Sequence, residues 1–183
     1  MVAVTLRSRR EVLRLAGGLA ASALFGARGA AAASRTTTRT LSLYSVNTSE
    51  HLAVEYFADG GYQPDALKAV SRLLRDHLTD QVHAIDPVLL DQLFVLRSAL
   101  GARDAFHVVC GYRSPETNAL RRRQHRGVAG HSFHIAGRAI DVFLPDRNLG
   151  QVRTAALRLG SGGVGYYPSS GFVHLDTGPV RTW

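Results

Sequence analysis

The sequence predicts a single α+β domain with a small antiparallel sheet and flanking helices. Alternating apolar and polar residues, the pattern of a strand, recur along the chain, and stretches of helical spacing lie between them. After subtraction of a leader, 183 residues suit one domain. The predicted strands cover residues 41–46, 105–110, 139–143, 163–167 and 171–175, and the predicted helices cover residues 63–78, 86–101 and 148–159 together with a shorter one that starts at Ser114.

Helix boundaries are marked by capping residues. The second helix has Asp86 as its cap and Pro87 as its first residue, and it stops at Gly101. The helix after Ser114 begins with a proline and an acid, which suit a first turn, and the last helix stops at Gly160. These signals favour helices as scaffold around the strands.

Residues 1–33 have the features of an export signal. Ser8-Arg9-Arg10-Glu11-Val12-Leu13 is a twin-arginine signature, and a weakly apolar stretch follows that is too short to cross a bilayer comfortably. Ala31-Ala32-Ala33 offers a cleavage site. We therefore expect export by the Tat machinery to the periplasm, a flexible tether over residues 34–40, and a folded domain over residues 41–183.

The chain is basic, with a formal net charge of +8. Residues 1–33 contain five arginines and one glutamate, so half of this net charge lies in the leader. The positive charge that remains suits anionic cell-wall polymers. No nucleic acid is expected as a partner, because the sequence has neither a recognition-helix motif nor the aromatic pattern of an RNA-binding sheet. Cys110 is the single cysteine, which excludes an intramolecular disulfide, and we expect it to be a buried, inert thiol.

Two histidines and one aspartate predict a zinc site. His134 lies in a Gly-rich loop, Asp141 lies on the strand that follows, and His174 lies on a later strand. Alternation along residues 139–143 lets Asp141 face back toward His134. Two imidazoles and one carboxylate are a donor set that holds Zn²⁺ while one coordination position stays open for water.

The same residues resemble a known family. Ser132-Phe133-His134-Ile135-Ala136-Gly137-Arg138-Ala139-Ile140-Asp141 matches SxHxxGxAxD, the zinc-site motif of the M15 zinc peptidases. Residues 110–118, 163–168 and 172–178 and the closing Arg181-Thr182-Trp183 resemble, more specifically, the DUF882 or YcbK-like murein endopeptidase branch. The resemblance covers almost the whole chain after the leader.

This resemblance implies the fold shared by M15 peptidases and the hedgehog signalling domain. It implies a monomeric, zinc-dependent endopeptidase that hydrolyses cross-links between the peptide stems of peptidoglycan. Zinc would be held by His134, Asp141 and His174, and Arg113 would contact the substrate or the developing oxyanion. The supporting residues would be Ser132, Gly137 and Tyr112.

The general base is left open. M15 carboxypeptidases have a glutamate three residues before the last zinc histidine, where this chain has Gly171. Asp176 lies on the same strand face as His174 and could accept a proton from water, or it could orient a ligand histidine. His131 is a third possibility, because an imidazole titrates near neutral pH.

Two other functions remain open. Without the family glutamate, the domain could be a non-catalytic wall-binding module that keeps zinc for stability. A carboxypeptidase that releases terminal D-alanine is the second. The sequence does not decide whether the bond cut is D-Ala to diaminopimelate, diaminopimelate to diaminopimelate, or a terminal D-Ala.

Overall fold

The computed structural model describes residues 38–124 and 129–183. The export signal predicted over residues 1–33 and the tether as far as residue 37 lie outside this part. The described part is α+β, as predicted: it contains eight strands, four α-helices and one 3₁₀ helix. Within it, no helix has the length and apolar character needed to cross a membrane.

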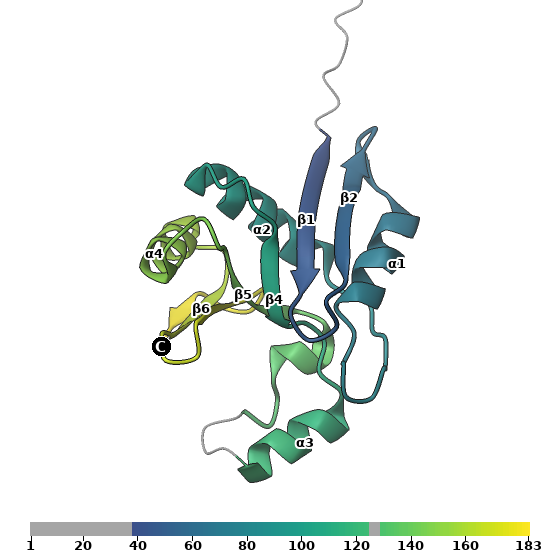
Figure 1. Cartoon of the computed structure of the whole chain (residues 1–183), viewed down its shortest axis with the longest axis vertical. Coiled ribbons are helices and arrows are strands. Elements are labelled where there is room, and N and C mark those ends of the chain that lie inside the picture. The colour runs from purple at the N-terminus through teal and green to yellow at the C-terminus, as the bar shows by residue number, and fades with distance from the viewer. Residues whose placement is uncertain (1–37, 125–128) are drawn as a thin grey trace, which may run out of the picture. The chain divides into compact units, whose positions relative to one another are not determined.

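All the strands belong to one sheet, in the order β3-β2-β1-β4-β5-β7-β6-β8 (Figure 1). Their bounds are β1 (Arg39–Ser45), β2 (His51–Ala58), β3 (Gly61–Tyr62), β4 (Phe106–Cys110), β5 (Ala139–Phe143), β6 (Gly163–Tyr167), β7 (Phe172–Asp176) and β8 (Arg181–Thr182). The prediction of a small antiparallel sheet was wrong in two respects. The sheet is mixed, because β1 with β4 and β6 with β8 pair in parallel, and it is larger, because β2, β3 and β8 were not predicted. β1 begins at Arg39, two residues before the predicted start of the folded domain.

The helices are α1 (Pro64–Leu73), α2 (Pro87–Leu100), α3 (Pro115–Gln124) and α4 (Leu149–Leu159), with η1 (Phe133–Ala136) as the 3₁₀ helix. The caps of α2 match the prediction: the Asp86 carboxylate accepts from the Val88 N–H, and Gly101 ends the helix in the left-handed conformation. The first helix is shorter than predicted. It ends at Leu73, because the chain leaves the helix so that the buried carboxylate of Asp76 can accept from the N–H groups of Leu78 and Ser114.

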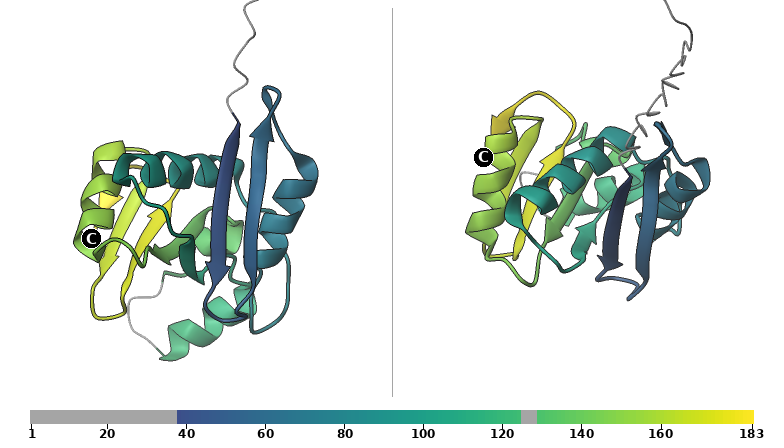
Figure 2. Two further views of the ribbon diagram at one scale, coloured as in Figure 1. Left: turned by 45° about the horizontal axis from the view of Figure 1, so that its top comes forward. Right: turned by 90° about the horizontal axis from the view of Figure 1, so that it is seen from above.

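The two faces of the sheet differ in polarity. Helices α1, α2 and α4 pack on one face, and Figure 2 shows α2 and α4 side by side along it. Leu43, Val142 and Val173 point into the apolar core beneath these helices. Side chains alternate along a strand, so Asp141 and His174 point to the opposite face, which we call the open face.

Gly137 holds the loop that precedes β5. It ends η1 with φ of 66°, in the left-handed region, and its carbonyl accepts from the Asp86 N–H at 2.9 Å. A Cβ added at this position would overlap the carbonyl oxygen of Ala84. Glycine is therefore required here both by the backbone conformation and by the close approach of a second chain segment.

Replacement of Gly137 by alanine should lower the free energy of unfolding by about 2 kcal/mol or more. The left-handed conformation costs a residue with a Cβ roughly 1–2 kcal/mol, and the overlap with Ala84 adds to this. Gly60→Ala is a matched control, because Gly60 has φ of 80° and nothing within 4 Å of an added Cβ. Denaturant unfolding of both variants measures the difference, and equal losses would show that the approach of Ala84 has no energetic effect.

Candidate metal centre

The candidate site is built by the register of β5 and β7. These antiparallel strands pair Asp141 directly with His174, and Asp141 Oδ1 lies 2.8 Å from His174 Nδ1. His134 reaches the pair from η1: its Nε2 lies 3.3 Å from Asp141 Oδ1 and 3.2 Å from His174 Nδ1. The structure thus brings together the three residues that the sequence analysis named as zinc ligands, and all three are buried.

Hydrogen bonds fix which ring nitrogen of each histidine faces this cluster. His134 Nδ1 lies 2.7 Å from the Gly111 carbonyl oxygen, which can only accept, so Nδ1 carries the proton and the Nε2 lone pair points at Asp141. In the neutral ring His174 Nε2 donates to Asp176 Oδ2 at 3.0 Å, and the His174 Nδ1 lone pair then points inward. Hydrogen-bond partners of this kind are typical of metal-binding histidines.

The three inward atoms fit a small cation. Two lone pairs and a carboxylate oxygen meet at 2.8–3.3 Å with no proton between them when both imidazoles are neutral. Ligand atoms bound at about 2.0–2.1 Å to a tetrahedral ion lie about 3.3 Å apart, close to these spacings. A divalent cation would remove the repulsion among the acceptors.

The electrostatics of the cluster point the same way. Burial by itself lowers the pKa of His134, but the Asp141 carboxylate outweighs burial and raises this pKa well above its usual value. The pKa of His174 is also raised, because hydrogen bonds to Asp141 and Asp176 outweigh burial. The cluster therefore favours added positive charge, whether protons or a metal ion supply it.

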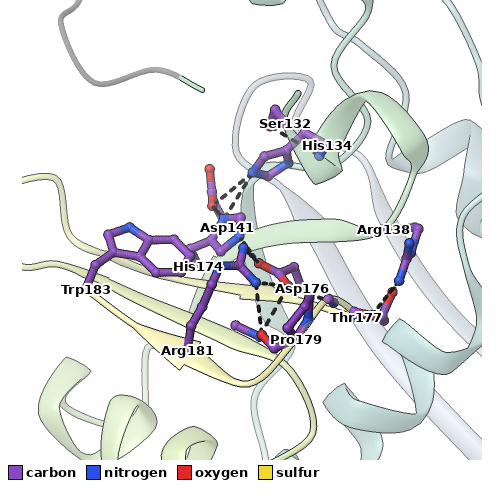
Figure 3. A network of polar contacts seen from close by, with 12 residues as sticks. Ser132, His134, Arg138, Asp141, His174, Asp176, Thr177, Pro179, Arg181 and Trp183 are labelled. Carbon is purple, nitrogen blue, oxygen red and sulfur yellow. Dashed lines mark hydrogen bonds and ion pairs between the residues drawn. The ribbon is translucent and has the colours of Figure 1, made fainter. Parts of the chain in front are cut away.

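Asp176 lies behind His174 and is completely buried. Its Oδ2 accepts from His174 Nε2 and from Arg181 Nη2 at 2.6 Å (Figure 3). Its Oδ1 accepts from the Gly178 N–H, the Gly163 N–H and Arg181 Nη1. Burial raises the pKa of Asp176, yet these donors outweigh burial and hold the pKa well below its usual range. Its acceptor positions are thus occupied by five donors, all of them on the side of His174 away from the cluster.

Cys110 lies closer to the site than we expected. Cys110 as a residue is only partly buried, and Cys110, His134 and Asp141 have potential ligand atoms within 4.8 Å of one another. A register shift between Val108 and Cys110 pairs Cys110 with Asp141 and turns it to the open face. His174 Nδ1 lies 3.2 Å from His134 Nε2 and 2.8 Å from Asp141 Oδ1, whereas Cys110 Sγ accepts from Arg113 Nη2 at 3.4 Å.

The other predicted site residues surround the cluster. Arg113 follows β4, and its Nη2 lies 4.0 Å from Asp141 Oδ2. The Ser132 hydroxyl caps η1 by accepting from the His134 N–H. Tyr112 is buried and stacks on the His83 ring at 4.9 Å, which makes it a packing residue, and His131 is exposed in the turn before η1.

Trp183 borders the site, and the sequence analysis gave it no role. Its ring centroid lies 5.3 Å from that of His174 (Figure 3). Its Nε1 donates to the Tyr167 hydroxyl at 2.7 Å. A Cβ at Gly165 would lie 2.7 Å from the indole, so the glycine makes room for it. Trp183 is 48% exposed and therefore forms an accessible wall beside His174.

Comparison with known proteins identifies the class. Residues 33–183 match the model of the M15 peptidase family described as peptidoglycan L,D-endopeptidase MepK, and the chain belongs to this family. The match begins at the end of the predicted leader and includes every residue of the candidate site.

Curated relatives of the chain carry the same description. It is 49% identical over 146 residues to the probable peptidoglycan L,D-endopeptidase MepK of Haemophilus influenzae, covering 79% of this chain and 78% of the relative. It is 39% identical over 176 residues to the peptidoglycan L,D-endopeptidase MepK of Escherichia coli, covering 96% and 97% of the two chains. A protein of the same name from Shigella flexneri matches equally well.

Asp76 positions the segment that carries Tyr112 and Arg113. Its buried carboxylate accepts from the N–H of Ser114 at 2.8 Å and from the N–H of Leu78 at 3.0 Å. Burial raises the pKa of Asp76, but these hydrogen bonds and those of the Ser114 and Thr117 side chains lower it to about 2. The ionised carboxylate therefore stabilises the folded state.

This stabilisation should disappear in acid. A folded-state pKa below the unfolded value contributes stability above the unfolded pKa, and the contribution is lost as pH falls through the folded pKa. The difference in free energy of unfolding between the wild type and Asp76→Asn should be about 2 kcal/mol larger at pH 6 than at pH 2. Denaturant titrations at both values measure it, with Asp65→Asn as the exposed control. A difference that does not change with pH would contradict the assigned role.

Proposed function

We propose that the chain hydrolyses peptide cross-links of peptidoglycan with a zinc ion held by His134, Asp141 and His174. As a member of its family, the chain is a peptidoglycan-hydrolysing peptidase. The observation that supports the metal most directly is the meeting of His134 Nε2, His174 Nδ1 and Asp141 Oδ1 at 2.8–3.3 Å. Two imidazoles and a carboxylate are a donor set typical of catalytic zinc.

When bound, zinc supplies Lewis acidity toward the scissile carbonyl and toward water. Arg113 lies beside the cluster with a nearly buried guanidinium, and among the described residues its Nε has no hydrogen-bond partner. A guanidinium here can donate to the oxyanion that develops at the carbonyl, where exclusion of water strengthens the interaction. We assign Arg113 to this role.

Asp176 suits orientation of His174 better than proton transfer. Both of its oxygens are occupied by donors, and Arg181 keeps it ionised, so it holds His174 with the Nδ1 lone pair directed at the cluster. Of the bases considered from the sequence, His131 is exposed, and among the described residues no hydrogen bond to its imidazole is found. We assign His131 as the proton acceptor.

The relatives are named as L,D-endopeptidases, which bears on the bond that is cut. A D-Ala to diaminopimelate cross-link joins two D-centres, whereas a diaminopimelate to diaminopimelate cross-link joins an L-centre to a D-centre. We propose the second bond as the substrate. Family membership also favours an endopeptidase over a D-alanine carboxypeptidase or a non-catalytic wall-binding module.

The remaining expectations stand as proposals. The twin-arginine signature and the start of the family match at residue 33 support Tat export of the domain to the periplasm. Family membership supports the fold shared by M15 peptidases and the hedgehog signalling domain. We propose that the mature domain acts as a monomer, because the candidate site is built entirely from one chain.

Zinc affinity and turnover should respond differently to the variants. Asp176→Asn should weaken zinc binding about 10–100-fold, because it removes the charge that orients His174, and His174→Ala should weaken it further. His131→Ala should leave zinc affinity unchanged and lower turnover about 10²–10⁴-fold. Competition with a chromogenic chelator measures affinity, and hydrolysis of dimeric muropeptides measures turnover. Unchanged zinc affinity in Asp176→Asn would contradict the orienting role.

Digestion of purified sacculi tests the reaction. The zinc-loaded domain should convert dimeric muropeptides joined through diaminopimelate into monomers, and a chelator or His174→Ala should abolish this. No new products at full zinc occupancy would favour the wall-binding module. Free D-alanine without loss of dimers would favour the carboxypeptidase. Chromatography of the released muropeptides separates the three outcomes.

A further inference from the structure

Aromatic side chains cross the open face of the sheet in one line, which we call the aromatic row. Its members come from six neighbouring strands, β2, β1, β4, β5, β7 and β6 (Figures 1 and 2). They are His51, Tyr44, His107, Phe143, Phe172 and Tyr167. The row is not part of the metal cluster, and the sequence analysis did not predict it.

Strand registers and ring contacts define the row. Tyr44 pairs with His51 on one side and with His107 on the other, with ring centroids 4.3 Å and 4.6 Å away. His107 pairs with Phe143 at 4.9 Å. At the far end Tyr167 pairs with Phe172, and their rings stack at 4.7 Å.

The register of β5 and β7 joins the two halves. Val142 pairs with Val173, so the next facing position along these strands places Phe143 opposite Phe172. Six strands spaced about 4.8 Å apart give the row a length of about 24 Å.

The aromatic row runs alongside the candidate metal centre. Phe143 lies two residues beyond Asp141 on β5, and Phe172 lies two residues before His174 on β7, so each pair shares the open face at a separation of about 7 Å along the strand. Asp141 and His174 are buried, whereas every member of the row is at least partly exposed. His51 and Tyr167 are the most exposed members. The row is thus an accessible surface beside the site.

We propose that the aromatic row binds the glycan strand of peptidoglycan while the attached peptide stem enters the metal centre. This inference rests on the proposed function for the identity of its ligand. Sugar rings have flat C–H faces that stack on aromatic rings and a rim of hydroxyl groups that needs hydrogen-bond partners. The row supplies both, through the exposed parts of its rings and through the imidazole nitrogens and tyrosine hydroxyls.

The length and placement of the row favour a linear polymer. About 24 Å of aligned rings suits several consecutive sugars. The peptide cross-link is covalently joined to the glycan, so a glycan held on the row keeps the cross-link close to the cluster and raises its effective concentration there. Polar residues next to the row on the open face, Ser42 and Glu55, suit a hydrated glycan better than an apolar protein partner.

The test measures glycan binding and peptide hydrolysis separately. Glycan strands freed of peptide by an amidase are the binding probe, and a soluble cross-linked peptide without sugars is the hydrolysis substrate. Tyr44→Ala should weaken binding of the glycan strands at least tenfold and slow digestion of intact sacculi. Hydrolysis of the sugar-free peptide should change less than twofold, because Tyr44 does not contact the metal cluster.

Tyr62→Ala is the matched control, since Tyr62 is an exposed tyrosine that bonds Asp91 and lies outside the row. It should bind glycan as the wild type does. Thermal unfolding of both variants checks that loss of binding is not loss of fold. Glycan binding by zinc-free His174→Ala should equal that of the wild type, because binding to the row requires no hydrolysis.

Three results would overturn the inference: no binding of glycan strands by the wild type, equal binding by the wild type and Tyr44→Ala, or loss of self-association in Tyr44→Ala without loss of glycan binding. The last would identify the row as a protein interface. Failure of the proposed function gives a different result. The sugar-free peptide would then stay intact with every variant, while glycan binding still depended on Tyr44.

Discussion

The register of β5 against β7 is the constraint on which the candidate site depends. It pairs Asp141 with His174 on the open face and places Val142 and Val173 in the apolar core. Because side chains alternate, a shift of one residue would bury the charged pair beneath the helices and expose the valines. The hydrophobic core therefore holds the candidate metal ligands in place.

A second layer of hydrogen bonds turns this placement into a defined donor set. The Gly111 carbonyl accepts from His134 Nδ1, and the Asp176 carboxylate, which also bonds Arg181, accepts from His174 Nε2. These bonds determine which nitrogen of each neutral ring faces the cluster. The Gly111 carbonyl belongs to the backbone directly after β4, and Asp176 is the last residue of β7. Little conformational entropy therefore remains to be lost when a ligand binds. Sites supported in this way by rigid elements keep their geometry without a ligand.

The sequence predicted much of the fold because many of its signals are local. Alternation gave the strands around Asp141 and His174, and capping residues such as Asp86 gave helix boundaries that the structure confirms. The predicted end of the first helix was wrong, because the Asp76 carboxylate accepts from the Ser114 N–H, and Ser114 is distant in the chain. Strands β3 and β8 have two residues each, too few for a periodic signal, and β2 was missed despite its length.

The sequence by itself determined the α+β class, the three acceptor residues and the position of the glycine that turns the loop beside them. The class and the acceptor residues follow from local residue patterns, and the glycine follows from the resemblance to the M15 motif. Only the tertiary structure decided that Cys110 faces Asp141, that Arg181 holds Asp176, and that rings from six strands form one row. These contacts depend on a register shift in one strand and on the order of the strands in the sheet. Both arise from pairing between segments that are far apart in the chain.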